Sequence, residues 1–177
     1  MTPRLAKPNP PMPLTIRSRQ KTHPADPWLL RRLAKWALAE TEPSQSAGPG
    51  SHELGVYLVG RAEMARANWE HLHHEGPTDV ITLDYGSAGA APKPGPIVGD
   101  VFICPAVAEE FAKQFNTSWA EEVVRYLIHG ILHLRGYDDS APGPRRTMKQ
   151  EENRLMQAAA ERFPLSRLAR GTKVVRR

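Results

Sequence analysis

Hydrophobic and polar positions along the chain follow two periods, which predicts a mixture of strands and helices. Short runs of period two, rich in β-branched and aromatic residues, predict strands over residues 14–18, 53–59, 78–84 and 97–103. Longer runs of helical period predict helices over residues 27–40, 61–74, 105–115, 118–134 and 145–162. Because helices interleave with strands and one strand pair can form a hairpin, the pattern favours an α+β fold, with a small mixed β-sheet of about four strands packed against helices.

The ends of several elements carry local signals. Asp26 followed by Pro27 predicts a helix start, since an aspartate caps free amides and proline suits the first helical position. Ser118 with Glu121 makes a capping box at the start of the long helix. The Gly/Ala/Pro-rich segment 86–96 predicts a mobile hairpin loop, and 42–51 predicts another loop.

The length of 177 residues predicts one domain. We expect a disordered, proline-rich tail over residues 1–12, a single catalytic domain over 13–163 and a basic tail over 164–177.

The run from His129 to Asp139 carries the clearest chemistry. His129 and His133 are four residues apart, so on a helix they share one face and both imidazoles can reach one cation. Gly136 suits the left-handed end of that helix, after which the chain can return Asp139 to the same ion. The spacing predicts a metal site at the end of a long helix, with His129, His133 and Asp139 as ligands. Three ligands leave one position open, as in catalytic zinc sites.

Two other interpretations stay open for this run. The histidines can be ordinary surface residues with Gly136 a simple helix stop, although their neighbours are apolar and buried imidazoles need partners. The spacing also matches the metzincin proteases, but the glutamate that serves them as general base is Gly130 here. That replacement argues for a different substrate or for a base from elsewhere.

The run resembles the signature of the YbeY family of bacterial endoribonucleases. Further motifs of that family have counterparts here: Asn68, Pro77 to Thr82, Gly99 to Cys104, and Met148 with Glu151 and Glu152. The resemblance covers roughly residues 13 to 160.

The resemblance implies a zincin-like fold and a zinc-dependent endoribonuclease that binds one Zn²⁺ ion. It implies single-stranded RNA as substrate, with ribosomal RNA and the small ribosomal subunit as partners, in maturation of the small-subunit rRNA 3′ end and in ribosome quality control. A cytoplasmic protein that binds neither membrane nor DNA is expected. No catalytic residue other than the metal ligands is assigned.

The chain departs from the family pattern at two positions. Asp139 stands where the family has a third histidine; it should make bound water less acidic and loosen discrimination against harder ions such as manganese. Leu72 stands where the family has an arginine implicated in catalysis. His71, His73 and His74 surround it, either as a solvated helix end or as a replacement cation or acid.

Other residues admit both a functional and a structural interpretation. Arg135 can contact phosphate or be an exposed helix-end residue, and Tyr137 can stack on a base or pack over the metal loop. Asp100 can organise the cleft or cap a buried turn, and Glu151 and Glu152 can form a solvated face or orient the ligands.

Charge and cysteine content indicate which partners and which kind of protein the chain can be. The net charge is +5, and the segments 1–22 and 163–177 contain ten basic residues and no acid, so the body between them has 14 basic and 19 acidic residues, a balance of −5. The basic ends can add salt-sensitive affinity for phosphates or simply aid solubility.

The single Cys104 cannot form an internal disulfide and predicts a small buried side chain. No apolar run is long enough for a membrane helix, and residues 1–13 lack the apolar core of a signal peptide.

Two other functions remain possible from the sequence. One is a zincin-like metalloprotease. The other is a non-catalytic ribosome-associated factor with a structural metal, although closed structural sites use four protein ligands.

Overall fold

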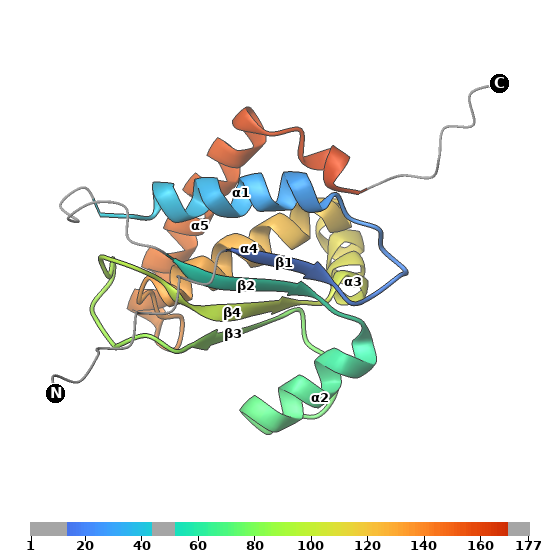
Figure 1. Ribbon diagram of the computed structural model, residues 1–177, viewed down its shortest axis with the longest axis horizontal. Coiled ribbons are helices and arrows are strands. Elements are labelled where there is room, and N and C mark those ends of the chain that lie inside the picture. The colour runs from blue at the N-terminus through green and yellow to red at the C-terminus, as the bar shows by residue number, and fades with distance from the viewer. Residues whose placement is uncertain (1–13, 44–51, 170–177) are drawn as a thin grey trace, which may run out of the picture.

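A four-stranded mixed sheet organises the computed structural model, which describes residues 14–43 and 52–169 (Figure 1). The strands are β1 (Thr15–Ser18), β2 (Glu53–Leu58), β3 (Val80–Asp84) and β4 (Val98–Ile103). Their order is β1-β2-β4-β3, with β1, β2 and β4 parallel and β3 antiparallel to β4. This order places β3 at one edge of the sheet.

Helices cover both faces of the sheet. They are α1 (Pro27–Glu40), α2 (Arg61–Leu72), α3 (Pro105–Phe115), α4 (Trp119–Leu134) and α5 (Pro142–Arg162). In Figure 1, α1 lies above the sheet with α4 and α5, and α2 lies below it. The α+β class expected from the sequence is confirmed.

The main core lies between one face of the sheet and helices α1, α4 and α5. Alternate residues of β2 point into it, because successive side chains of a strand face opposite sides, and Leu54, Val56 and Leu58 are almost fully buried. The opposite face forms a smaller cluster in which Met64 of α2 and Cys104 are buried. Cys104 is thus the small buried side chain that was predicted.

Predicted helix starts are confirmed where a side chain caps the helix. Asp26 accepts hydrogen bonds from the amides of Trp28 and Leu29 at 2.9 and 3.2 Å. The capping box of Ser118 and Glu121 is present in both directions, at 3.1 and 2.8 Å. Helix α5 starts at Pro142, earlier than the predicted 145, because proline is well placed in a first turn.

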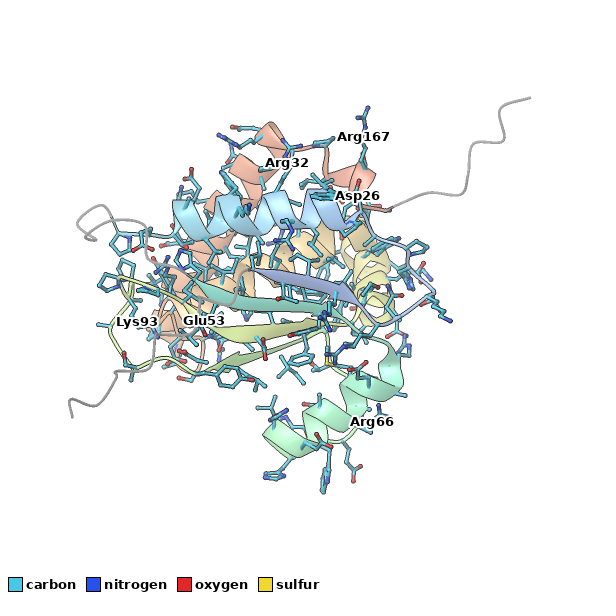
Figure 2. All side chains as sticks on the ribbon, in the orientation of Figure 1. Asp26, Arg32, Glu53, Arg66, Lys93 and Arg167 are labelled. Carbon is cyan, nitrogen blue, oxygen red and sulfur yellow. The ribbon has the colours of Figure 1, made fainter. Side chains whose placement is uncertain are left out.

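Packed structure continues beyond residue 163. A short 3₁₀ helix, η1 (Leu165–Leu168), buries Leu165 and Leu168 in the main core. Ala169 bridges to Ala25 just before α1, and the labels of Asp26 and Arg167 mark this junction in Figure 2. The segment expected as a basic tail therefore begins with packed residues. The predicted tail over 1–12 and the remainder of the predicted tail, 170–177, lie outside the described residues, as does most of the predicted loop 42–51.

Arg135 is a buried structural residue, and both interpretations of it as an exposed side chain are wrong. It is only 1% exposed and lies at the end of α4. Its guanidinium donates to the carbonyls of Leu38 and Gly95 at 3.2 and 2.7 Å and pairs with the Glu42 carboxylate. It therefore joins the ends of α1 and α4 to the loop between β3 and β4. The amide of Lys93 in that loop donates in return to Arg135 O at 2.7 Å.

Within the described ranges, no helix combines the length and apolarity needed to span a bilayer.

Candidate metal centre

Helix α4 places two imidazoles one turn apart, facing the same side. His129 Nε2 and His133 Nε2 lie 3.0 Å from each other. Asp139 Oδ2 lies 3.6 Å from each of these nitrogens. The structure thus brings together the three residues that the sequence selected as metal ligands.

The turn that returns Asp139 is a Schellman motif at the end of α4. Gly136 has a φ of +87°. The amide of Gly136 donates to His133 O at 2.9 Å, and the amide of Tyr137 donates to Leu132 O at 3.0 Å. A Cβ at Gly136 would also lie 2.7 Å from Gly89 O. Glycine is therefore required here both by the backbone conformation and by the close approach of the loop.

The spacing of the donor atoms fits one small cation. Tetrahedral ligands at about 2.0–2.2 Å from a common zinc ion lie about 3.4 Å apart. The observed separations of 3.0, 3.6 and 3.6 Å bracket that value. Two imidazole nitrogens and a carboxylate oxygen are also a donor set that zinc accepts. The group can therefore hold a metal ion.

Each imidazole is oriented by an acceptor behind it. His129 Nδ1 lies 3.0 Å from Glu152 Oε2, and His133 Nδ1 lies 3.1 Å from Tyr137 O. A carboxylate and a carbonyl can only accept, so Nδ1 carries the proton in both rings. Both Nε2 atoms point to the shared position, as in metal sites whose histidine ligands are held by an outer layer of hydrogen-bond partners.

Glu152 is the centre of a buried charged cluster, which supports the interpretation that it orients the ligands and not that it belongs to a solvated face. It is 4% exposed and accepts from Arg125 Nη1 at 2.8 Å and Lys149 Nζ at 2.7 Å as well as from His129. Burial alone would raise the pKa of Glu152, but the hydrogen bonds from His129, Lys149 and Arg125 outweigh it and lower the pKa to about 2. The side chain is ionised at neutral pH and orients His129. Glu151 instead pairs with Arg154.

Burial, followed by the neighbouring His129, lowers the pKa of His133. The neutral imidazole, which is the form that binds metal, is favoured at neutral pH. The aromatic ring of Tyr137 packs against the main core, so the structure supports the packing interpretation of that residue.

The three residues His129, His133 and Asp139, together the donor group, open into a cleft of about 700 Å³. Its walls come from β3, the end of α2, and α4 with the loop after it, with these lining residues: Leu72, Asp79, Val80, Ile81, Thr82, Asp84, His129, His133 and Asp139. β4 does not border the cleft, because it is an inner strand of the sheet. Asp100 of β4 lies on the face away from α4 and accepts from Tyr85 OH at 3.1 Å, so neither interpretation of it holds.

The end of α2 borders the cleft through Leu72 alone. Asn68 holds this end in place, since it is buried and its Nδ2 donates to Gly76 O at 2.9 Å. His73 terminates α2 in a left-handed conformation and packs edge-on to Trp69. None of the three histidines around Leu72 lines the cleft, so none of them takes the place of the family's arginine at the cleft wall.

Gly130 lets α4 lie directly on the sheet. A Cβ at this position would be 2.8 Å from both methyl groups of Val101 and 3.1 Å from Thr82 Oγ1. A glutamate therefore does not fit between α4 and the strands. The absence of the protease base has a packing cause in this fold.

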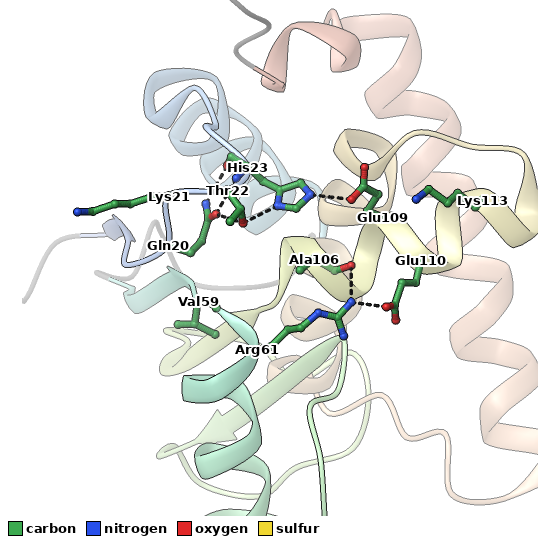
Figure 3. Close-up of a pocket in the computed structure, with 11 residues that line it drawn as sticks. Gln20, Lys21, Thr22, His23, Val59, Arg61, Ala106, Glu109, Glu110 and Lys113 are labelled. Carbon is green, nitrogen blue, oxygen red and sulfur yellow. Dashed lines mark hydrogen bonds and ion pairs between the residues drawn. The ribbon is translucent and has the colours of Figure 1, made fainter.

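A second hollow of about 550 Å³ lies at the carboxyl ends of β1 and β2 (Figure 3). Both carboxylates that line it are paired: Glu110 with Arg61, and Glu109 with His23 Nε2 at 3.1 Å. No metal-ligand group of the described residues lies there. The cleft beside β3 is therefore the stronger candidate site.

The fold and the donor group define a zincin-like α+β protein with a possible metal centre in an open cleft. The family model for endoribonuclease YbeY matches residues 15–160. An endoribonuclease YbeY of Chlorobium luteolum is 38% identical over 129 residues, which cover 72% of this chain and 90% of that protein. An endoribonuclease YbeY of Thermobifida fusca is 38% identical over 138 residues, 75% of this chain and 85% of that protein.

The chain belongs to the endoribonuclease YbeY family, as the sequence motifs indicated. The solution structure of a Thermotoga maritima protein has the same fold, with a TM-score of 0.54 at 22% identity over 90% of this chain and 99% of that one.

Proposed function

We propose that this protein is a zinc-dependent endoribonuclease that cleaves single-stranded RNA, with His129, His133 and Asp139 as the zinc ligands. The observation that carries the proposal is the convergence of three donor atoms within 4.8 Å of one another at the wall of an open cleft. Three protein ligands leave a coordination position for water or a phosphate oxygen. The family relationship supplies RNA as the substrate class.

The chain's own residues prepare the site for phosphodiester cleavage. Glu152 and the carbonyl of Tyr137 hold the two imidazoles in one tautomer and one orientation. Asp139, half-exposed at the rim, adds the only negative charge among the ligands. When bound, the ion would supply positive charge that stabilises the transition state and lowers the pKa of a bound water.

We further propose that ribosomal RNA of the small subunit is the substrate, with its 3′ end as the cleavage region and ribosome quality control as the setting. These assignments follow from the resemblance of the motifs, and they imply a cytoplasmic protein. Residues 13–163 would form the catalytic domain. The basic ends would add affinity for RNA that falls with salt.

The test combines elemental analysis with cleavage of a single-stranded RNA, before and after chelation. The proposal expects one zinc per chain, cleavage that chelation abolishes and zinc restores, and no cleavage by His133→Ala. Cleavage of casein that His133→Ala abolishes would indicate a protease instead. RNA cleavage retained by His129→Ala with a lowered melting temperature would indicate a structural metal.

The same assay identifies the attacking group. Loss of cleavage when a 2′-deoxy nucleotide stands at the cut site indicates attack by the ribose 2′-hydroxyl. Normal cleavage of that substrate indicates attack by water.

A further inference from the structure

The register of β3 against β4 fixes the direction of its backbone groups. The amide of Tyr85 donates to Val98 O at 2.9 Å, and the amide of Cys104 donates to Asp79 O at 2.9 Å. In an antiparallel pair, residues that bond to the neighbouring strand alternate with residues that do not. The odd-numbered residues of β3 therefore bond to β4.

The even-numbered residues Val80, Thr82 and Asp84 turn their amides and carbonyls to the outer edge. The amide of Val80 donates to Asp79 Oδ1 at 2.9 Å. Across residues 14–43 and 52–169, the amides and carbonyls of Thr82 and Asp84 have no hydrogen-bond partner. Unpaired groups at a strand edge are ready to bind another chain.

This edge is also a wall of the cleft that contains the donor group. Thr82 and Asp84 line the same cleft as His129 and His133. Thr82 lies close against α4, since its Oγ1 is 3.1 Å from the position of a Cβ on Gly130. An extended chain bound along β3 would therefore pass the donor group.

We propose that the outer edge of β3 binds the sugar–phosphate backbone of the RNA, an inference that rests on the proposed function. The amides of Thr82 and Asp84 donate to phosphate oxygens, and the carbonyls of β3 accept from ribose 2′-hydroxyl groups. Two residues of a strand span about 6.6 Å, so the two amides contact successive nucleotides of an extended strand. Because DNA lacks the 2′-hydroxyl, this edge selects RNA.

The charges of the cleft make RNA binding along this edge depend on the metal ion. Among the residues that the structure describes, the lining contains Asp79, Asp84 and Asp139 and neither lysine nor arginine. Lys93 pairs with Asp84 at 3.0 Å, which leaves two uncompensated carboxylates. A divalent ion at the donor group offsets them, so a metal-free cleft repels the phosphates that the loaded cleft accepts.

The first test compares Thr82→Pro with Thr82→Ala. Proline removes the outward amide, and the ladder to β4 is retained because that amide does not take part in it. Alanine removes the hydroxyl and methyl groups of the side chain and keeps the outward amide. Fluorescence anisotropy with a short single-stranded RNA, under conditions in which a gel shows the probe intact, should give about tenfold weaker binding for the proline variant and unchanged binding for the alanine variant. Equal binding by folded Thr82→Pro and the zinc-loaded wild type overturns the proposal.

The second test needs no substitution. In zinc-loaded ¹⁵N-labelled wild-type protein, RNA should shift the amide resonances of Thr82 and Asp84 and leave those of Ile81 and Leu83 nearly unchanged. Single-stranded DNA should shift the Thr82 and Asp84 resonances less than RNA does. RNA cleavage without these shifts overturns the edge proposal and leaves the proposed function intact. A protein that neither binds nor cleaves RNA overturns both. Amide shifts caused by a strand-forming peptide and not by RNA overturn the edge proposal in favour of a peptide ligand.

Discussion

Replacing Glu152 tests the support of the donor group without touching a ligand. Glu152→Gln keeps the size of the side chain and an oxygen that can accept from His129, but removes the charge. In the native protein this carboxylate lies 3.0 Å from His129 Nδ1 and is 4% exposed, so little solvent screens its charge. Loss of the charge makes His129 a weaker ligand and removes the closest charged partner of Arg125.

The expected loss of zinc affinity is ten- to hundredfold, or about 1.4–2.7 kcal/mol, which is the usual effect of removing a partner of a metal-bound histidine. The metal-free protein should also lose stability. Since the pKa of Glu152 falls from 4.5 to about 2, its charge stabilises the fold by about 3 kcal/mol at neutral pH. A carboxyl group whose pKa is lowered in the folded state stabilises the fold at pH values above its pKa in the unfolded chain. This contribution of Glu152 disappears as the pH falls from 4.5 towards 2.

The assay is competition for zinc against a chromophoric chelator, with melting of the chelated protein measured from pH 7 down to pH 2.5. Glu151→Gln is the matched control, because its neighbouring carboxylate pairs with Arg154 at 2.6 Å and does not contact His129. Zinc affinity of Glu152→Gln equal to that of Glu151→Gln would refute the reasoning. So would a difference in melting temperature from wild type that stays constant down to pH 2.5.

Three further substitutions test other parts of the account. Arg135→Met should lower the free energy of unfolding by about 3–5 kcal/mol in urea titrations, because it removes the buried guanidinium that pairs with Glu42 and donates to several carbonyls; a loss below about 1 kcal/mol contradicts this. Gly130→Ala should cost about 1–3 kcal/mol through its clash with Val101, and adding Val101→Ala should recover part of it; no recovery contradicts the packing argument. Leu72→Arg should tighten RNA binding and steepen its salt dependence, since it adds a cation to the cleft wall; unchanged affinity and slope contradict this.

Local signals in the sequence were sufficient to predict that His129, His133 and Asp139 lie together and to predict most helices and strands. The spacing of His129 and His133, the glycine at 136 and the cap at Ser118 each act within one or two turns, and the structure places them as expected. The same holds for the α+β class, because strand and helix periods are properties of short segments.

The roles of residues that act across long sequence separations could not be decided in this way. The sequence left Glu152 open between a solvated face and orienting the ligands, and both interpretations of Arg135 were wrong. Glu152 meets His129 from 23 residues away, and Arg135 meets Leu38 from 97 residues away. An arginine at a helix end looks like a surface residue until the loop and α1 close over it. The exclusion of β4 from the cleft likewise depends on strand order, which places β4 inside the sheet.

The most direct measurement is the zinc content of freshly purified wild-type protein and of His133→Ala, determined by elemental mass spectrometry on matched concentrations. The account predicts one zinc per wild-type chain and its loss from the folded variant. Wild-type protein without zinc, or a variant that retains all of it, would contradict the central claim that His129, His133 and Asp139 hold one metal ion.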